Sequence, residues 1–143
     1  MTTDTLATKW DNVKKPCHYA NHPSGIECCE ISKYLSAGLS QAFQYVWRFE
    51  DKGGTQDLEK AIKWIEIELT IEPEDVHHLN PDLILRNLNC VLVHETDHFK
   101  STALEVIAKA NSFDNGTRRG YLACAISAIT DLIVAETGGI GAP

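Results

Sequence analysis

Two amphipathic stretches joined by a double glycine set the strongest limit on how this chain can fold. Residues 39–50 and 55–69 both place apolar side chains three and four positions apart, which is the spacing of one helical face. Gly53 and Gly54 end the first stretch, and Thr55 is a suitable N-cap for the second. The pattern therefore predicts two helices joined by a tight turn.

The remaining chain repeats this helical signal, while the alternation typical of strands is weak throughout. Further helices are predicted over residues 26–36, 83–93 and 121–135, and the second of these is compatible with a continuation to residue 110. We therefore expect an all-α fold, a compact bundle of about five to six helices. The expected organisation is a single domain with three parts: a flexible N-terminus (1–15), a first helical region (16–69) and a helical extension packed on it (70–137).

The composition of the chain argues against several classes of binding partner. The chain has 143 residues, 43% of them hydrophobic, and a net charge of -7, which argues against sequence-independent nucleic-acid binding. The N-terminus has no apolar segment typical of a signal peptide, and no apolar run reaches membrane-spanning length. Five cysteines do not form the even set of a secreted disulfide framework. We expect a cytoplasmic protein that contacts neither nucleic acid nor membrane, and a homo-oligomer because a small chain carries many apolar helices.

The turn between the first two helices has the composition of a phosphate site. Glycines allow a phosphate to approach the unpaired amides at a helix N-terminus, where the helix dipole favours negative charge. Gly53, Gly54 and Thr55 supply these amides, with Lys52 beside them and Arg48 one turn earlier. We therefore predict that phosphate binds here.

Aromatic side chains near this turn supply surfaces on which a base could stack. Tyr45, Trp47 and Trp64 are the three candidates. The alternative interpretation is an ordinary interhelical turn, because aromatic residues at helical spacing usually belong to the core.

Five blocks of the first region, in this order, resemble a family of short bacteriophage proteins. The family is catalogued as domain of unknown function 3310 and labelled phage nucleotide kinase. The blocks are P-C-H-Y (16–19), G-I-E-C (25–28), Q-Y-V-W-R (44–48), K-G-G (52–54) and D-L-E-K-A-I-K-W-I (57–65). The resemblance covers residues 16–69. The chain departs from the family pattern at Gln44, where a lysine is usual, and at Ile65, where a tyrosine is usual.

The resemblance implies a nucleotide-binding protein of an infected bacterial host. We expect it to bind a phosphate-bearing nucleotide, linear or cyclic, and to sequester a nucleotide immune signal without needing a cofactor. The alternative is a nucleoside monophosphate kinase that lacks a P-loop and uses Mg²⁺, held through phosphate by Glu27 or Asp57. The turn and the resemblance together give the expected nucleotide-binding residues: His18, Tyr19, Tyr45, Arg48, Lys52, Gly53, Gly54, Thr55, Lys60 and Trp64.

A second motif, H-E-T-D-H at residues 94–98, matches the H-E-x-x-H pattern of zinc metallopeptidases. On a helix this pattern would place His94 and His98 on one face for zinc, with Glu95 as general base. Glu105 and Glu136 are candidate third ligands. The alternative interpretation is two solvated histidines that pair with neighbouring carboxylates.

A group of soft side chains near the N-terminus is a further candidate for structural zinc. It consists of Cys17, His18, His22, Cys28 and Cys29. Their spacing follows no standard zinc motif, and cysteine is also a common core residue.

Overall fold

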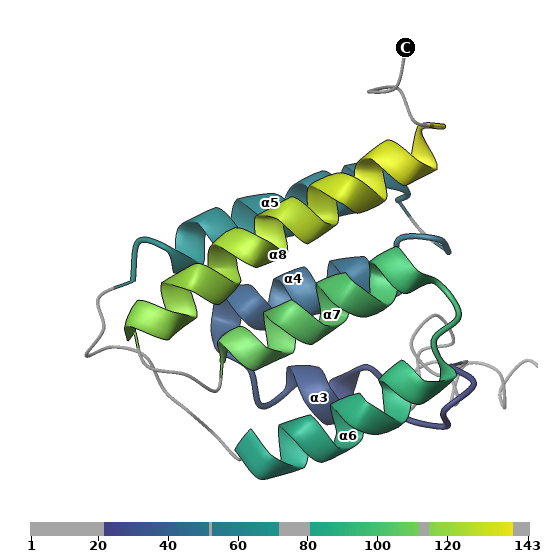
Figure 1. The fold of residues 1–143 in the computed structure, drawn as a ribbon, viewed down its shortest axis with the longest axis horizontal. Helices are drawn as coiled ribbons and strands as arrows, with labels where there is room; N and C mark the ends of the chain where they lie inside the picture. The colour runs from purple at the N-terminus through teal and green to yellow at the C-terminus, as the bar shows by residue number, and fades with distance from the viewer. Residues whose placement is uncertain (1–21, 52, 72–80, 112–114, 139–143) are drawn as a thin grey trace, which may run out of the picture.

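The computed structural model describes residues 22–51, 53–71, 81–111 and 115–138, and these ranges contain six helices and no strand. The predicted all-α fold, a compact bundle, is therefore confirmed (Figure 1). None of the described helices carries an apolar stretch long enough to cross a bilayer. The helices are α3 (Cys29–Ser32), α4 (Ala37–Arg48), α5 (Thr55–Glu68), α6 (Pro81–His94), α7 (His98–Ala110) and α8 (Asn115–Glu136).

The helices stack in three layers of two. Figure 1 shows α5 beside α8, α4 beside α7, and α3 beside α6, and contacts join the partners within each layer and the neighbouring layers. Each layer therefore pairs one helix from the first half of the chain with one from the second half. The last turn of α4 consequently has α5 on one side and the start of α7 on another.

The apolar positions predicted to face inward on α4 and α5 form the centre of the core. Because three- and four-residue spacing aligns side chains on one face, a single stripe from each helix is removed from water. The fully buried members of these two stripes are Leu39, Phe43, Val46, Leu58, Ala61 and Ile65.

Three helix boundaries differ from the predictions. The first helix, predicted over 26–36, is reduced to the four residues of α3. The helix predicted over 83–93 is present as α6, but the continuation to 110 that the sequence allows is absent, because α6 ends at His94 and Asp97 caps a new helix by accepting from the Lys100 amide. Helix α8 begins at Asn115, before the predicted start at 121, and thereby includes a polar segment that looks like a turn in the sequence.

A buried ion pair joins the end of α5 to the start of α8. Arg118 Nη2 lies 2.8 Å from Glu68 Oε1, and the two side chains are only 2% and 1% exposed. The Ser36 hydroxyl, at the N-cap of α4, donates to the same Glu68 oxygen and lies 3.4 Å from Arg118 Nη2. Arg118 Nε is buried without a hydrogen-bond partner among the described residues. The guanidinium therefore depends on Glu68 for its charge compensation.

Asn111, directly after α7, connects the end of a fourth helix to the residues around this ion pair. Its side-chain oxygen accepts from the Ser36 amide at 2.9 Å, and its side-chain nitrogen donates to the Tyr34 carbonyl at 3.3 Å. Gly38 provides the room for Glu68, because a Cβ at this glycine would lie 2.5 Å from Glu68 Cγ. We call Ser36, Glu68, Asn111 and Arg118 the helix-end cluster.

Glu68→Leu and Arg118→Met are each expected to lower the free energy of unfolding by about 3–5 kcal/mol, because each leaves one buried charge unpaired. The double variant is expected to be more stable than either single variant, because neither charge remains. Urea unfolding of all four proteins measures this coupling. Glu105→Ala, which breaks the half-exposed pair with Lys109, is the control and should cost about 1 kcal/mol or less. Additive losses in the double variant would contradict the role of the pair.

Candidate functional site

The last turn of α4 and the first turns of α5 bring two cations onto one aromatic ring. The guanidinium carbon of Arg48 lies 4.8 Å from the centroid of the Tyr45 ring. Lys60 Nζ lies 5.8 Å from the same centroid. The quadrupole of the ring attracts both charges, which favours this arrangement despite their mutual repulsion. The sequence-predicted residues Tyr45, Arg48 and Lys60 thus lie together.

Asp57 compensates one of these cations. Its carboxylate is buried, with Oδ2 at 3.7 Å from Arg48 Nε, and it accepts the Gly53 amide at 3.1 Å. A Cβ at Gly53 would lie 2.3 Å from Asp57 Oδ1, so the glycine is needed for this approach. We call Tyr45, Arg48, Asp57, Lys60 and Trp64 the α4–α5 face.

The backbone amides of the Gly-Gly turn are largely used within the chain. Gly53 donates to Asp57, Gly54 donates to the Phe49 carbonyl at 2.8 Å, and Gln56 donates to the Gly53 carbonyl at 3.2 Å. Gly54, with a φ of 59°, is the residue before α5, and Thr55 is the first helical residue rather than the predicted N-cap. An anion at this turn would therefore meet side chains more readily than amides.

The predicted aromatic residues point in different directions. Trp64 lies one turn after Lys60 on α5, half-buried against the core. Trp47 is buried and faces Phe43 and His22, with ring centroids 5.7 Å and 4.9 Å away. The predicted residues His18, Tyr19 and Lys52 lie outside the described residues.

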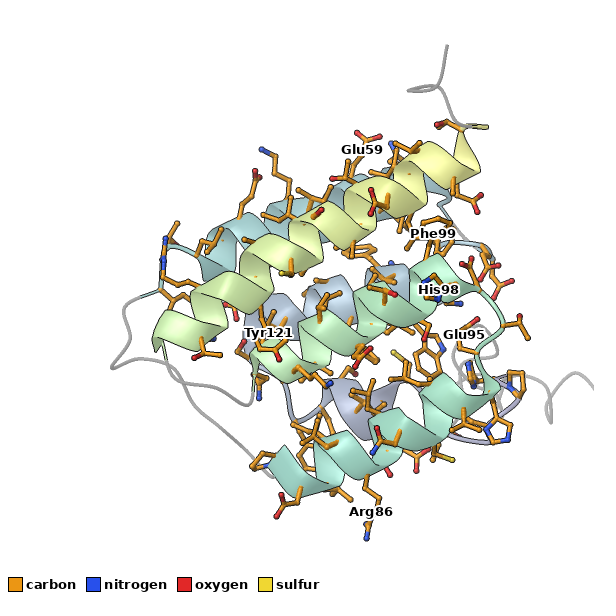
Figure 2. The ribbon with its side chains drawn as sticks, in the orientation of Figure 1. Glu59, Arg86, Glu95, His98, Phe99 and Tyr121 are labelled. Carbon is orange, nitrogen blue, oxygen red and sulfur yellow. The ribbon has the colours of Figure 1, made fainter. Side chains whose placement is uncertain are left out.

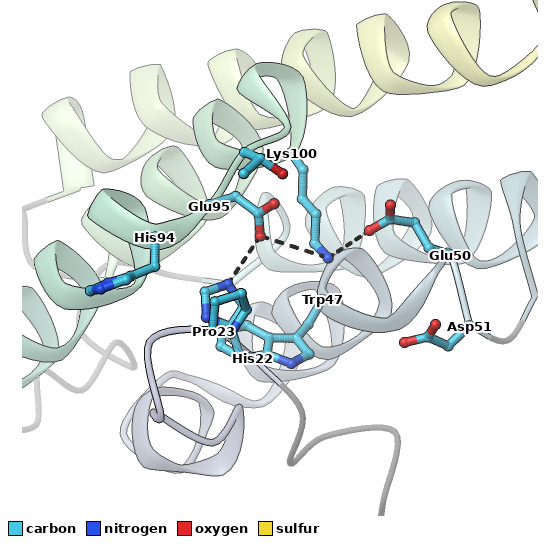
Figure 3. Close-up of a pocket in the computed structure, with 9 residues that line it drawn as sticks. His22, Pro23, Trp47, Glu50, Asp51, His94, Glu95 and Lys100 are labelled. Atoms are coloured by element: carbon cyan, nitrogen blue, oxygen red, sulfur yellow. Dashed lines mark hydrogen bonds and ion pairs between the residues drawn. The ribbon is translucent and has the colours of Figure 1, made fainter.

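A cavity of about 230 Å³ opens on another side of the α4 end (Figure 3). It lies between the end of α4, the loop that starts at His22 and the link from α6 to α7, and we call it the α4–α7 pocket. Sequence reasoning did not find it, because its walls come from three segments that are distant in the chain. Its lining residues are His22, Pro23, Trp47, Glu50, Asp51, His94, Glu95, Thr96 and Lys100.

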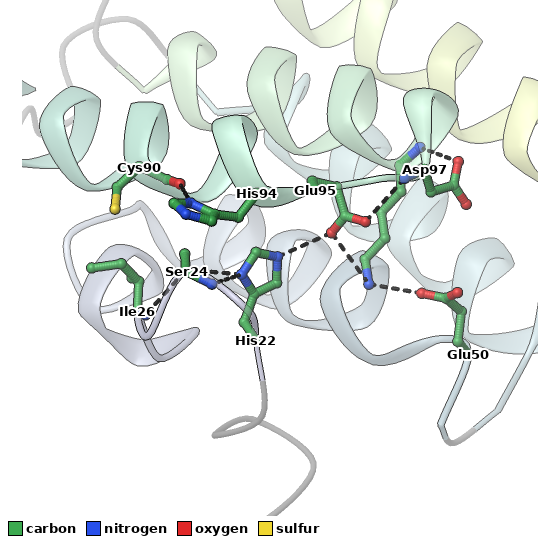
Figure 4. A network of polar contacts seen from close by, with 9 residues as sticks. His22, Ser24, Ile26, Glu50, Cys90, His94, Glu95 and Asp97 are labelled. Carbon is green, nitrogen blue, oxygen red and sulfur yellow. Dashed lines mark hydrogen bonds and ion pairs between the residues drawn. The ribbon is translucent and has the colours of Figure 1, made fainter.

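A buried polar chain crosses the floor of this pocket (Figure 4). Glu95 Oε1 accepts from His22 Nε2 at 3.2 Å and lies 3.8 Å from Lys100 Nζ. Lys100 Nζ also lies 2.8 Å from Glu50 Oε1. The side chains of His22, Glu95 and Lys100 are only 6%, 9% and 9% exposed, whereas that of Glu50 is 49% exposed. The chain of contacts therefore runs from the interior to the rim.

The loop geometry defines which nitrogen of His22 carries the proton. The Ser24 amide donates to His22 Nδ1 at 3.1 Å, so Nδ1 is an acceptor and the proton lies on Nε2, facing Glu95. The Ser24 hydroxyl lies 2.8 Å from the same nitrogen and accepts from the Ile26 amide at 3.1 Å. These contacts close the loop and direct the imidazole toward Glu95.

The H-E-T-D-H segment does not form the helical zinc motif that its sequence resembles. His94 is the last residue of α6 and His98 the first of α7, so the two imidazoles do not share a helical face. Figure 2 shows Glu95 in the link between the two helices and His98 at the start of α7. His94 Nδ1 is 2.9 Å from the Cys90 carbonyl, and Glu95 is turned toward His22. The break arises because Asp97 caps α7, which removes the geometry required by the metallopeptidase hypothesis.

The described part of the cysteine–histidine group is also not arranged around a metal. Burial raises the pKa of the Cys28 thiol, and partial burial together with the Glu27 carboxylate raises that of the exposed Cys29. Cys17 and His18 lie outside the described residues. Among the described residues, no group of three or more His, Cys, Asp or Glu side chains is placed to hold a metal ion.

Comparisons of the chain with models of known families, with characterised proteins and with solved structures find no match. Two features of the described residues therefore bear on its function: the chemistry of the α4–α5 face and that of the α4–α7 pocket.

Cys28 is expected to resist alkylation by iodoacetamide at pH 8, because its raised pKa keeps the buried thiol protonated at a pH where an ordinary thiol is partly ionised. The exposed Cys124 is expected to react in the same sample. Peptide mass spectrometry after timed quenching measures both sites, and urea-unfolded protein is the control in which both react. Equal rates at the two cysteines in the folded protein would show that Cys28 is accessible and ionised.

Proposed function

We propose that the protein binds a phosphate-bearing nucleotide at the α4–α5 face and holds it without chemical change. The observation that carries this proposal is the convergence of Arg48 and Lys60 on the Tyr45 ring. The chain as a whole has a net charge of -7, whereas this face carries the cations of Arg48 and Lys60 against the single carboxylate of Asp57, so its charge is opposite in sign to that of the whole protein. Local positive charge attracts an anion even on an acidic protein.

The two cations have complementary roles toward phosphate. Asp57 and the Tyr45 ring hold the Arg48 guanidinium, so a planar donor is already oriented when the ligand arrives. Lys60 is exposed, and its ammonium can follow the phosphate as a mobile point charge. Together they support charge-assisted hydrogen bonds to two oxygens of one phosphate.

Trp64 is the aromatic residue that supports base stacking in this proposal. Tyr45 carries Arg48 and Lys60 over its ring, so its role is to gather the cations. Trp64 lies one helical turn beyond Lys60 on the same helix and is half-buried, which leaves part of the indole to contact a base.

Binding without turnover is favoured over phosphoryl transfer by the position of Asp57. A kinase uses a carboxylate to hold Mg²⁺ on the phosphates. On this face Asp57 is buried and already engaged by Arg48 and the Gly53 amide. Together with the resemblance, this favours a phage-type protein that sequesters a nucleotide signal. A nucleoside monophosphate kinase with Mg²⁺ is the alternative that the resemblance implies.

Release of bound ligand separates these two functions. The protein is incubated with a panel of mono-, tri- and cyclic nucleotides and Mg²⁺, washed, denatured, and the released compound is identified by mass spectrometry. Recovery of the intact nucleotide is expected. A phosphorylated product in solution would establish the kinase alternative, and the absence of both retention and product would contradict nucleotide binding.

Lys60→Ala is expected to weaken the affinity for the retained nucleotide about tenfold, because one charge-assisted contact to phosphate is lost. Lys63→Ala is the matched control, since Lys63 lies on the same helix with its side chain 82% exposed and paired with Glu66. Isothermal titration calorimetry measures both affinities. Equal affinities for the two variants would show that the phosphate does not contact the α4–α5 face.

Arg48→Lys keeps the charge beside Asp57 but removes the planar donor. We expect it to fold with little loss of stability and to bind the nucleotide less tightly than the wild type, because an ammonium cannot make the two parallel hydrogen bonds of a guanidinium. The measurement is calorimetric affinity combined with the thermal unfolding midpoint. Unchanged affinity would contradict the proposed role of Arg48.

A further inference from the structure

We propose that the α4–α7 pocket is a second binding site, which takes a small organic cation with a primary amine or guanidinium group. The site is independent of the nucleotide proposed for the α4–α5 face. Three observations support this proposal: the charge balance of the pocket, the arrangement of its buried groups, and its size and walls.

The pocket carries an excess of negative charge. Three carboxylates line it, those of Glu50, Asp51 and Glu95, against the single ammonium of Lys100. The lining also contains two imidazoles, those of His22 and His94, which add nothing to the formal charge at pH 7. An anionic ligand would therefore meet net repulsion here, whereas a cation would meet attraction.

The buried groups of the network contact one another, so the carboxylates at the rim are the ones available to a ligand. Lys100 and Glu95 lie together in the floor, and His22 and the Asp97 amide donate to the two oxygens of Glu95. Glu95 is therefore fully engaged inside the protein.

The carboxylates at the rim are differently placed. Glu50 reaches Lys100 but remains 49% exposed, so it can share its second oxygen with a ligand. Asp51 is exposed and makes no ion pair within the part of the chain that the structure describes. Figure 3 shows both side chains at the end of α4. These two carboxylates are the groups that we expect to meet the ligand cation.

The size and walls of the pocket define the ligand further. A volume of about 230 Å³ is below the range of about 300–1,000 Å³ found for drug-sized ligands, so the ligand is small. Trp47 and Pro23 supply an aromatic and an apolar wall next to the polar floor. An indole also attracts a cation through its ring quadrupole. A short alkyl chain ending in an amine or guanidinium matches this combination.

Calorimetric titration with agmatine, which carries both an amine and a guanidinium, tests the proposal on the full chain. Agmatine is expected to bind, and butyrate, of similar chain length but negative, is not. Asp51→Asn and Glu50→Gln are each expected to weaken agmatine binding about tenfold or more, through loss of one charge pair. Glu66→Gln, an exposed carboxylate on α5, is the matched control and should leave binding unchanged.

Absence of agmatine binding overturns the proposal, as does binding that all three variants leave unchanged. Preferential binding of butyrate would reverse the sign of the site and also overturn it. The position of the ligand is read from the indole N–H signals in NMR spectra, assigned with Trp47→Phe and Trp64→Phe. The signal of Trp47 is expected to shift on addition of agmatine. A shift of Trp64 alone would place agmatine on the α4–α5 face and contradict a separate site.

Discussion

The buried pair of Arg118 and Glu68 is the interaction on which the rest of the arrangement depends. Two charges removed from water must find each other with good geometry, or the cost reaches several kcal/mol. Because Glu68 ends α5 and Arg118 lies in the first turns of α8, the pair fixes the relative position of these helices. Ser36 and Asn111 extend the constraint to the start of α4 and the end of α7. The start of α4 and the end of α5 are thereby held together, and toward the other end of this helix pair Lys60 Nζ lies 5.8 Å from the centroid of the Tyr45 ring.

Near the other end of α4, the charged side chains on its two sides differ in sign. Tyr45 and Trp47 are two residues apart, and such positions on a helix point to nearly opposite sides. On the Tyr45 side lie Arg48 and Lys60, and on the Trp47 side lie the carboxylates of the α4–α7 pocket. One helix end thereby presents an excess of positive side-chain charge on one side and of negative charge on the other. The second half of the chain supplies Glu95 and Lys100 to the pocket.

Local periodicity was sufficient to predict α4, α5 and their buried stripes, because the burial of Leu39 or Ile65 follows from three- and four-residue spacing. It also places Tyr45 and Arg48 on one face of α4. Their meeting with Lys60 depends on how α4 and α5 pack, and in the sequence only the resemblance implies it. Periodicity could not predict features that depend on distant partners. In the sequence, Arg118 lies in a segment with the composition of a turn. Its helical position and burial depend on Glu68, which is 50 positions away in the chain.

The break between α6 and α7 has a similar origin. Glu95 leaves the helical pattern to meet His22, 73 positions earlier in the chain, and Asp97 then caps α7. The contact with His22 has no local signal. Asp97 is a residue type that favours the N-cap position, but the H-E-x-x-H spacing also fits a continuous helix. The pocket was missed for the same reason, since His22, Trp47 and Lys100 come from separate segments.

The most direct test of the account is a crystal structure of the protein with the nucleotide that it retains. The account predicts that the phosphate lies within hydrogen-bonding distance of Lys60 Nζ and the Arg48 guanidinium, with the Asp57 carboxylate still on the Gly53 amide. A phosphate bound in the α4–α7 pocket, or one that displaces Asp57 from the Gly-Gly turn, would contradict it.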